Sequence, residues 1–277
     1  MNMKRINVAL AQIATKIGDK SHNLRVIENI CTDAREKNTE LIIFPELSLT
    51  GYICRDDFYQ LAENINGTSV NYVKKIAKKN DMFIVFGMPT IGKVKNVIYN
   101  SSIIVSPDEK IYSYDKLYLP THSVFEEKRY FRQGNKIKTF DVKGLKVGMS
   151  ICYDLYFPEI YRILALEGAE LVICISASPS TRKEYFEILI KARAIENGIF
   201  IVLVNRVGIE DGLSFWGGSQ IVGPNGDIIR KGLYYDEETI YSNVDLRELD
   251  KTRPFIPALR DLRPEIIDEL SKAYHDL

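Results

Sequence analysis

The sequence LKVGMSICYDLYFPE, residues 145–159, decides how the rest of the chain is interpreted. Leu145–Ile151 is a short, mostly apolar run after Gly144, which is typical of a buried strand. Cys152 follows it, and Pro158 then opens a segment with helical spacing, where proline suits the first turn. A thiol between a strand end and a helix start meets unpaired backbone N–H groups, which stabilise a thiolate and an adjacent oxyanion. The alternative is that Cys152 is a small buried hydrophobic residue, and this stretch alone leaves both open.

Composition limits the classes of protein to which the chain can belong. A length of 277 residues suits one large domain or two small ones, and a hydrophobic content of 45% supports a sizeable core. The 37 basic and 37 acidic residues balance, so the sequence predicts neither a nucleic-acid nor a membrane-surface partner. The apolar run in residues 1–13 is too short for a signal peptide, and no later run could span a bilayer. The four cysteines show no metal spacing, which predicts a reduced, cytoplasmic setting.

Hydrophobic periodicity predicts alternating strands and helices without repeats or linkers, hence one α/β domain over residues 1–277. Strands are predicted at 5–13, 41–44, 82–88, 97–106, 110–114, 145–151, 171–175, 200–205, 214–222 and 228–230, and helices at 23–37, 69–80, 160–166 and 182–197. Residues 119–134 are predicted to be a long loop rich in aromatic residues, of the kind that walls a site.

Three residues with complementary chemistry each follow a predicted strand, namely Glu46, Lys116 and Cys152. An α/β sheet collects such strand ends at one edge, where ligands bind. A carboxylate that removes a thiol proton, a thiolate that attacks a carbonyl and an ammonium that stabilises an oxyanion together suit acyl transfer. Taken singly, Glu46 also fits a solvated loop acid and Lys116 a surface lysine.

A cysteine–histidine hydrolase is a different possibility. His122 is the only histidine in a plausible catalytic position, because His22 starts a polar helix and His275 lies in the tail. No orienting acid at a strand end accompanies His122, so the sequence favours the carboxylate arrangement. A non-catalytic partner with the same fold is a further alternative, although such a copy need not keep all three residues.

The order of the motifs resembles that of the carbon–nitrogen hydrolase (nitrilase) superfamily. The resemblance rests on FPEL (44–47) with TGY (50–52), DK (115–116), and ICYD (151–154) with FPE (157–159). It extends through KARAIEN (191–197), VNR (204–206), GS (218–219), PNG (224–226) and the tail LRDLRPE (259–265). It implies a four-layer αββα sandwich.

The resemblance also implies a role for each matching residue. Glu46 would be the general base, Lys116 the oxyanion stabiliser and Cys152 the nucleophile, with the backbone N–H of Tyr153 as a second oxyanion donor. Glu127 matches the auxiliary glutamate of the family, although its neighbour Glu126 is equally acidic. No metal or organic cofactor would be needed.

The expected substrate is a small linear carboxamide, hydrolysed to carboxylic acid and ammonia. Tyr153-Asp154 after the nucleophile resembles the amidase branches, whereas nitrilases usually carry Trp-Glu. The segments 116–120 and 124–131 and the position of Ser178 resemble the glutaminase domain of NAD synthetase, but the chain has no ATP-pyrophosphatase loop of the SGGxDS type. Tyr52, Tyr153 and Ser178 are the expected substrate-binding residues. An N-carbamoyl amine hydrolase is the first alternative, a free-standing glutaminase subunit the second, and a nitrilase is less favoured.

The resemblance further implies assembly. Members of the family dimerise partly through the helix that corresponds to residues 182–197, and this helix is apolar on more than one side. The sequence therefore predicts a homodimer or larger homo-oligomer, with the tail from about residue 247 making dimer or surface contacts.

Overall fold

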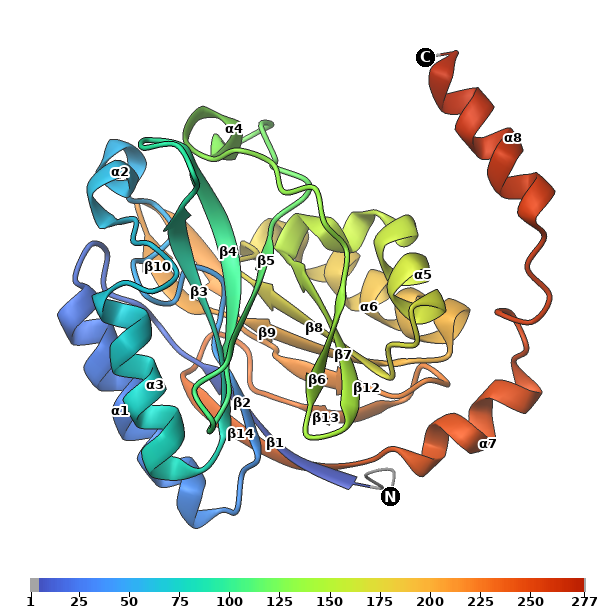
Figure 1. Cartoon of the computed structure of the whole chain (residues 1–277), viewed down its shortest axis with the longest axis horizontal. Helices are drawn as coiled ribbons and strands as arrows, with labels where there is room; N and C mark the ends of the chain where they lie inside the picture. The colour runs from blue at the N-terminus through green and yellow to red at the C-terminus, as the bar shows by residue number, and fades with distance from the viewer. Residues whose placement is uncertain (1–4, 277) are drawn as a thin grey trace.

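The computed structural model describes residues 5–276, so the first four residues of the N-terminal run and both limits of the predicted domain lie outside it. Within these residues two six-stranded sheets lie against each other, with helices on their outer faces (Figure 1). The first sheet has the order β14 (Glu238–Asp245), β1 (Arg5–Gln12), β2 (Leu41–Ile43), β3 (Phe83–Ile91), β4 (Ile98–Val105), β5 (Ile111–Asp115). The second has the order β13 (Ile228–Lys231), β12 (Gln220–Val222), β9 (Phe200–Asn205), β8 (Leu171–Ser176), β7 (Leu145–Ile151), β6 (Thr139–Val142).

The remaining elements cover the sheets or connect them. A two-stranded hairpin consists of β10 (Val207–Glu210) and β11 (Leu213–Trp216). The helices are α1 (Lys20–Glu36), α2 (Phe58–Leu61), α3 (Thr68–Asn80), α4 (Glu127–Tyr130), α5 (Pro158–Leu166), α6 (Lys183–Asn197), α7 (Arg247–Phe255) and α8 (Pro264–His275). Short 3-10 helices span η1 (Arg55–Asp57), η2 (Cys152–Tyr156) and η3 (Ser180–Arg182).

The layers follow from the alternation of side chains along the strands. On β1, Val8 and Leu10 pack in the core cluster shared with the second sheet, while Ala9 and Ala11 pack with residues of α1 and α3. The second sheet is buried on both faces, between the first sheet and helices α5 and α6. Because both of their faces are buried, the inner strands β8 and β9 consist of nearly continuous apolar residues. The predicted αββα sandwich is confirmed.

Strand direction brings the predicted strand ends to one edge. Strand β2 is parallel to β3, and β5 runs the same way because both β3–β4 and β4–β5 are antiparallel pairs. Glu46 after β2 and Lys116 after β5 therefore emerge at the same edge of the first sheet. In the second sheet β7 is parallel to β8, and Cys152 directly follows β7.

Two glycines allow the backbone to close around these strand ends. A Cβ on Gly87 would lie 2.3 Å from the backbone nitrogen of Leu47, next to Glu46. A Cβ on Gly134 would lie 2.1 Å from the carbonyl oxygen of Asp115, and the Gly134 N–H donates to the carbonyl of Lys116 at 2.8 Å. Any larger residue at these two positions would push Glu46 and Lys116 out of place.

The structure corrects several sequence-based boundaries. The strand predicted over 214–222 is two strands in different sheets, because Gly217 and Gly218 both have positive φ and turn the chain between them. The predicted loop at 119–134 contains the one-turn helix α4. Strands β6, β10 and β14 are present but were not predicted.

The C-terminal part leaves the body of the molecule. Helix α8 extends away from the sandwich (Figure 1), and all of its residues are exposed. No helix in residues 5–276 has the length and the apolar character that a membrane span requires.

Candidate active site

Lys116 lies at the centre of a buried cluster of charges. Its Nζ donates to Oε1 of Glu46 and to Oε1 of Glu127, each at 2.7 Å. Lys116 is 1% exposed and Glu46 is fully buried, so the alternatives of a surface lysine and a solvated loop acid are wrong. The pKa of Lys116 lies well above its usual value, because the two carboxylates outweigh the opposing effect of burial.

Glu46 is held by donors from three other parts of the chain. Besides Lys116, the side-chain amide of Asn100 donates to Oε1 at 2.7 Å. The backbone N–H of Ala177, just after β8, donates to Oε2 at 2.8 Å. This carboxylate therefore fixes the two sheets relative to each other at the edge where their strand ends meet.

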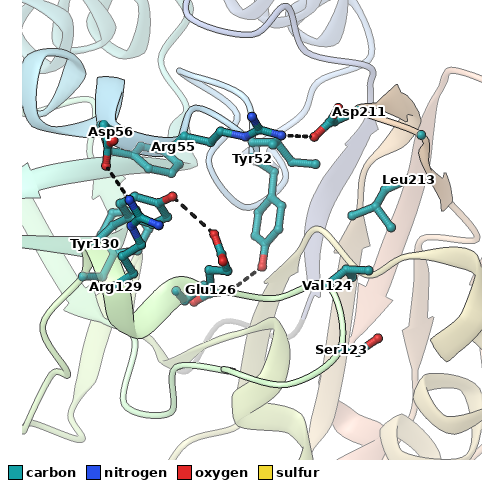
Figure 2. A pocket seen from close by; sticks show the side chains of 15 residues that line it. Tyr52, Arg55, Asp56, Ser123, Val124, Glu126, Arg129, Tyr130, Asp211 and Leu213 are labelled. Carbon is teal, nitrogen blue, oxygen red and sulfur yellow. Dashed lines mark hydrogen bonds and ion pairs between the residues drawn. The ribbon is translucent and has the colours of Figure 1, made fainter.

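Glu127 is held from its other side by Tyr52, whose hydroxyl donates to Oε1 at 2.6 Å. Its second oxygen, Oε2, is buried and has no hydrogen-bond partner among the described residues. Burial raises the pKa of Glu127 to about 7, aided by Glu46 and opposed by Lys116. The neighbouring Glu126 is exposed and instead faces Tyr130 (Figure 2). Of the two candidate glutamates, the structure thus places Glu127 in the cluster.

Cys152 occupies the sharp turn between β7 and η2. Its φ is +47°, which is uncommon for a residue with a side chain and marks local strain. Cys152 is almost fully buried and lines a cavity of about 120 Å³. The residues that line this cavity are Pro120, His122, Phe125, Cys152, Tyr153, Tyr156, Ser178, Pro179, Arg182 and Phe186.

The electrostatics of Cys152 differ from what the sequence suggested. A strand-to-helix position predicts a stabilised thiolate, but the pKa of Cys152 is raised well above its usual value. Burial is the main cause, and the negative charge of Glu46 adds to it, whereas Lys116 acts in the opposite direction. The resting thiol therefore carries its proton, and a nearby base is needed before it can attack.

Asp154 connects the turn at Cys152 with the strand end that carries Lys116. Its carboxylate accepts from the backbone N–H of Ile151 at 3.0 Å, from the Tyr114 hydroxyl at 2.8 Å and from the Tyr118 N–H at 3.0 Å. Burial raises the pKa of Asp154 to about 6. One side chain thus restrains the residue before Cys152 and residues on both sides of Lys116.

The predicted substrate-binding residues fall into two groups. Tyr153 and Ser178 line the cavity beside Cys152, and the buried hydroxyl of Ser178 has no partner among the described residues. Tyr52 does not line this cavity but contacts Glu127. His122 lies at the cavity wall, with its ring 5.3 Å from that of Tyr153.

A larger cleft of about 830 Å³ lies on the other side of Tyr52 and Glu127, which both line it. Figure 2 shows charged pairs across it. Arg55 pairs with Asp211, and Arg129 lies 3.8 Å from Asp56. All four of these side chains are more than half exposed.

A second buried ion pair was not singled out from the sequence. Arg206, which directly precedes β10, pairs with Glu210 at the end of that strand. Both residues are almost fully buried. Arg206 belongs to the VNR motif, but Glu210 follows no recognisable pattern. Its contacts are to backbone N–H groups more than 150 residues earlier in the chain, which no local signal could reveal.

Comparison with known proteins finds strong similarity along most of the chain. A family model described as carbon-nitrogen hydrolase matches residues 7–254. Probable nitrilase C965.09 of Schizosaccharomyces pombe is 34% identical over 96% of this chain and 98% of its own. An (R)-stereoselective amidase of a Pseudomonas species is also 34% identical, over 93% of this chain and 92% of its own. The crystal structure of a carbon-nitrogen hydrolase from Helicobacter pylori G27 superposes with a TM-score of 0.89 and 26% identity, covering 96% of this chain and 98% of that one.

The raised pKa of Glu127 predicts a pH-dependent contribution to stability. The folded protein keeps this proton up to about pH 7, whereas the unfolded chain releases it near pH 4.5. The folded state therefore binds more protons in this window, and Glu127 lowers the unfolding free energy as the pH rises through it. The wild type should therefore lose unfolding free energy relative to Glu127→Gln as the pH rises from 4.5 to about 7. The difference should be about 1–3 kcal/mol, since one pKa unit corresponds to about 1.4 kcal/mol.

Urea unfolding of the wild type and both glutamine variants at the two ends of this window measures the difference. Glu126→Gln is the matched control and should follow the wild type, because Glu126 is exposed. The same pH dependence for Glu127→Gln and the wild type would contradict the assignment of a raised pKa to Glu127.

Proposed function

Because the chain belongs to the carbon–nitrogen hydrolase family and is therefore a hydrolase acting on carbon–nitrogen bonds, we propose that it is an amidase for a small linear carboxamide. The observation that carries this proposal is the single buried system formed by Cys152 and the Glu46–Lys116–Glu127 cluster. It brings together a nucleophile, a base and a cation, which acyl transfer needs, and the nucleophile lines a small cavity.

The reaction has two halves. Glu46 takes the proton of Cys152, and the thiolate attacks the amide carbon to form a tetrahedral intermediate. Its oxyanion is stabilised by Lys116 and by the backbone N–H of Tyr153. Protonated Glu46 then donates to the amine as the carbon–nitrogen bond breaks, and ammonia leaves. Water that gives its proton to Glu46 attacks the remaining thioester, and Cys152 recovers its proton as the acid is released. No metal or organic cofactor takes part.

The choice of an amide rests on the surroundings of the nucleophile. Amide hydrolysis requires an acid for the leaving amine, which Glu46 supplies once it holds the thiol proton. A nitrile has no leaving group in its first step. Relatives described as a probable nitrilase and as an amidase are each 34% identical to this chain, so the amide is favoured by the Tyr153-Asp154 sequence rather than by similarity. An N-carbamoyl amine hydrolase, a glutaminase subunit, a nitrilase and a non-catalytic partner remain less favoured alternatives.

The cavity supports a substrate that carries a carboxylate at its far end. Among the described residues that line it, Arg182 is the only arginine or lysine and there is no carboxylate, and the others are mostly aromatic or apolar. Arg182 is half-buried, with its guanidinium 5.9 Å from the ring centre of Tyr185. The buried, unpartnered hydroxyl of Ser178 adds a second polar contact. A short ω-carboxyl carboxamide matches this combination of one cation, one hydroxyl and a narrow apolar wall.

We also propose a cytoplasmic location and a single domain that assembles as a homodimer. The four cysteines form no disulfide in the described part of the chain, as expected in a reducing compartment. Helix α6 exposes Tyr185 and Ile188, while α8 exposes Ile266 and Leu270. Helix α8 is 12 residues long and buries none of them, and helices this short are marginal in water unless their apolar side is covered.

Ammonia release from a panel of short amides, N-carbamoyl amines and nitriles tests the proposed activity. Short aliphatic or ω-carboxyl amides should give acid and ammonia, with a thioester on Cys152 visible by intact mass after rapid acid quench. Cys152→Ala should lose turnover by several orders of magnitude and keep the unfolding temperature of the wild type, because only the attacking sulfur is removed. Efficient nitrile conversion, or turnover of carbamoyl compounds without simple amides, would show that another branch is correct.

Replacing Arg182 tests the choice of substrate within that activity. Arg182→Leu should raise KM for an ω-carboxyl amide by about 10- to 100-fold, since a charged hydrogen bond contributes about 1.5–3 kcal/mol. A neutral amide of the same length is the control and should keep its KM. Equal losses for both substrates would mean that Arg182 shapes the cavity without binding a carboxylate.

Light scattering tests the proposed assembly. The wild type should have twice the chain mass of 31.7 kDa, and Ile188→Asp should shift it towards the monomer. Val94→Asp is the matched control, because the two side chains are 66% and 65% exposed, and it should leave the mass unchanged. A monomeric wild type, or equal effects of both variants, would exclude an interface at α6.

A further inference from the structure

The buried carboxylate of Glu210 holds the loop that carries Tyr52. Its Oε2 accepts from the backbone N–H groups of Tyr52 and Ile53, each at 2.9 Å. Its Oε1 accepts from Arg206 and, at 3.3 Å, from the hydroxyl of Thr15. The two backbone N–H groups and the guanidinium can only donate, so they leave no place for a side-chain NH₂ group.

The loop held in this way is tightly fitted. Gly51 has a φ of +84°, and a Cβ there would lie 3.0 Å from Cα of Ile17 and 3.1 Å from Oε1 of Glu210. The next residue, Tyr52, packs edge-on against the rings of Phe125 and Phe215. The tyrosine ring therefore has little freedom, and the position of its hydroxyl follows the position of its backbone.

Tyr52 passes this restraint on to the charged cluster. Its hydroxyl donates to Oε1 of Glu127 at 2.6 Å, and the same oxygen accepts from Lys116 at 2.7 Å. A shift of the loop would move the hydroxyl, change the hydrogen bonding of Glu127 and so displace the ammonium of Lys116. A continuous series of buried hydrogen bonds thus runs from Glu210 to the cluster.

We infer that Glu210, kept in place by Arg206, is a positioning residue that sets the geometry of Glu127 and Lys116 through Tyr52. This rests on the proposed roles of the cluster in amide hydrolysis. Glu210 touches neither Cys152 nor the cavity above it, so its effect appears in the rate of the chemical step and not in substrate binding.

The exposed pairs in the same region cannot perform this function. Arg55 with Asp211 and Arg129 with Asp56 join the same segments at the rim of the cleft (Figure 2). Exposed ion pairs contribute little, because water competes for both charges. Glu210 is 3% exposed, so the orientation of the Tyr52 loop depends on this buried carboxylate.

Two substitutions separate charge from placement. Glu210→Gln keeps the shape but presents an NH₂ group to donors, and Glu210→Asp keeps the charge but withdraws the carboxylate from the Tyr52 and Ile53 amides. Each should lower kcat on the order of 10²-fold with little change in KM, since a small displacement of reacting groups has an effect of that size. Unchanged kcat in a folded variant would overturn the inference, and so would failure of both variants to fold.

Glu63→Gln is the matched control for the loss of a structural carboxylate. Glu63 also accepts a backbone N–H, that of Ser69 at 2.8 Å, and pairs with Lys20, but it holds the start of α3 away from the cluster. It should lower the unfolding temperature and leave kcat unchanged. An equal loss of kcat in Glu63→Gln would show that kcat follows general stability and would overturn the specific role of Glu210.

A double-mutant cycle with Tyr52→Phe tests the route through the hydroxyl. If Glu210 acts through Tyr52, Glu210→Gln should reduce kcat far less in the Tyr52→Phe background than in the wild type. Independent effects, which multiply in the double variant, would overturn the proposed connection.

Alkylation of Cys152 by iodoacetamide separates this inference from the proposed activity. Its rate constant depends on deprotonation of the thiol beside Lys116 and needs no turnover. It should fall in Glu210→Gln and Glu210→Asp and stay at the wild-type value in Glu63→Gln. An inactive wild type with this alkylation pattern would refute the amidase proposal and support the role of Glu210, whereas wild-type alkylation in all three variants would refute that role.

Discussion

The structure depends on one ammonium group that lies between two carboxylates out of contact with water. Transferring Lys116 from water into the interior is costly, and removing a partner from a buried ion pair typically costs about 3–5 kcal/mol. Glu46 and Glu127 come from distant parts of the chain, so the first sheet and the α4 loop must both be in place before this charge is compensated. Only the complete fold supplies both partners that stabilise the buried charge of Lys116.

The same cluster explains the chemistry proposed for Cys152. Burial is the main cause of the raised pKa of the thiol, and the negative charge of Glu46, joined by that of Glu127 above about pH 7, adds to it. In the proposed mechanism, a thiolate is unfavourable there until its charge passes to a substrate carbonyl, whose oxyanion would lie next to Lys116. Under this proposal, the site favours the charge distribution of the tetrahedral intermediate over that of the resting thiolate, which is the requirement for catalysis.

The sequence predicts the α/β strands and the meeting of Glu46, Lys116 and Cys152 at one edge because these leave local signals, whereas the four-layer arrangement and the place of Glu127 are implied by the resemblance. Apolar runs such as β8 mark buried strands; Glu46 and Cys152 follow such runs, and Lys116 follows the predicted strand that forms β5. Strand β10 left no such signal because it is only four residues long, and β11 was merged with β12 into one predicted strand across a glycine turn. The protonated state of Cys152 and the contacts of Glu210 depend on groups brought together only by folding, and a linear pattern does not contain them.

The protonated resting state of Cys152 has a consequence for the durability of the protein. Peroxides oxidise thiolates rapidly and thiols slowly, and repeated oxidation of a cysteine to the sulfinic and sulfonic acids is in general irreversible. As the proposed nucleophile, Cys152 would keep its proton between turnovers and present little thiolate to such oxidants in its cavity of about 120 Å³. The burial that makes the sulfur dependent on a base thus also protects it from oxidative damage while no substrate is bound.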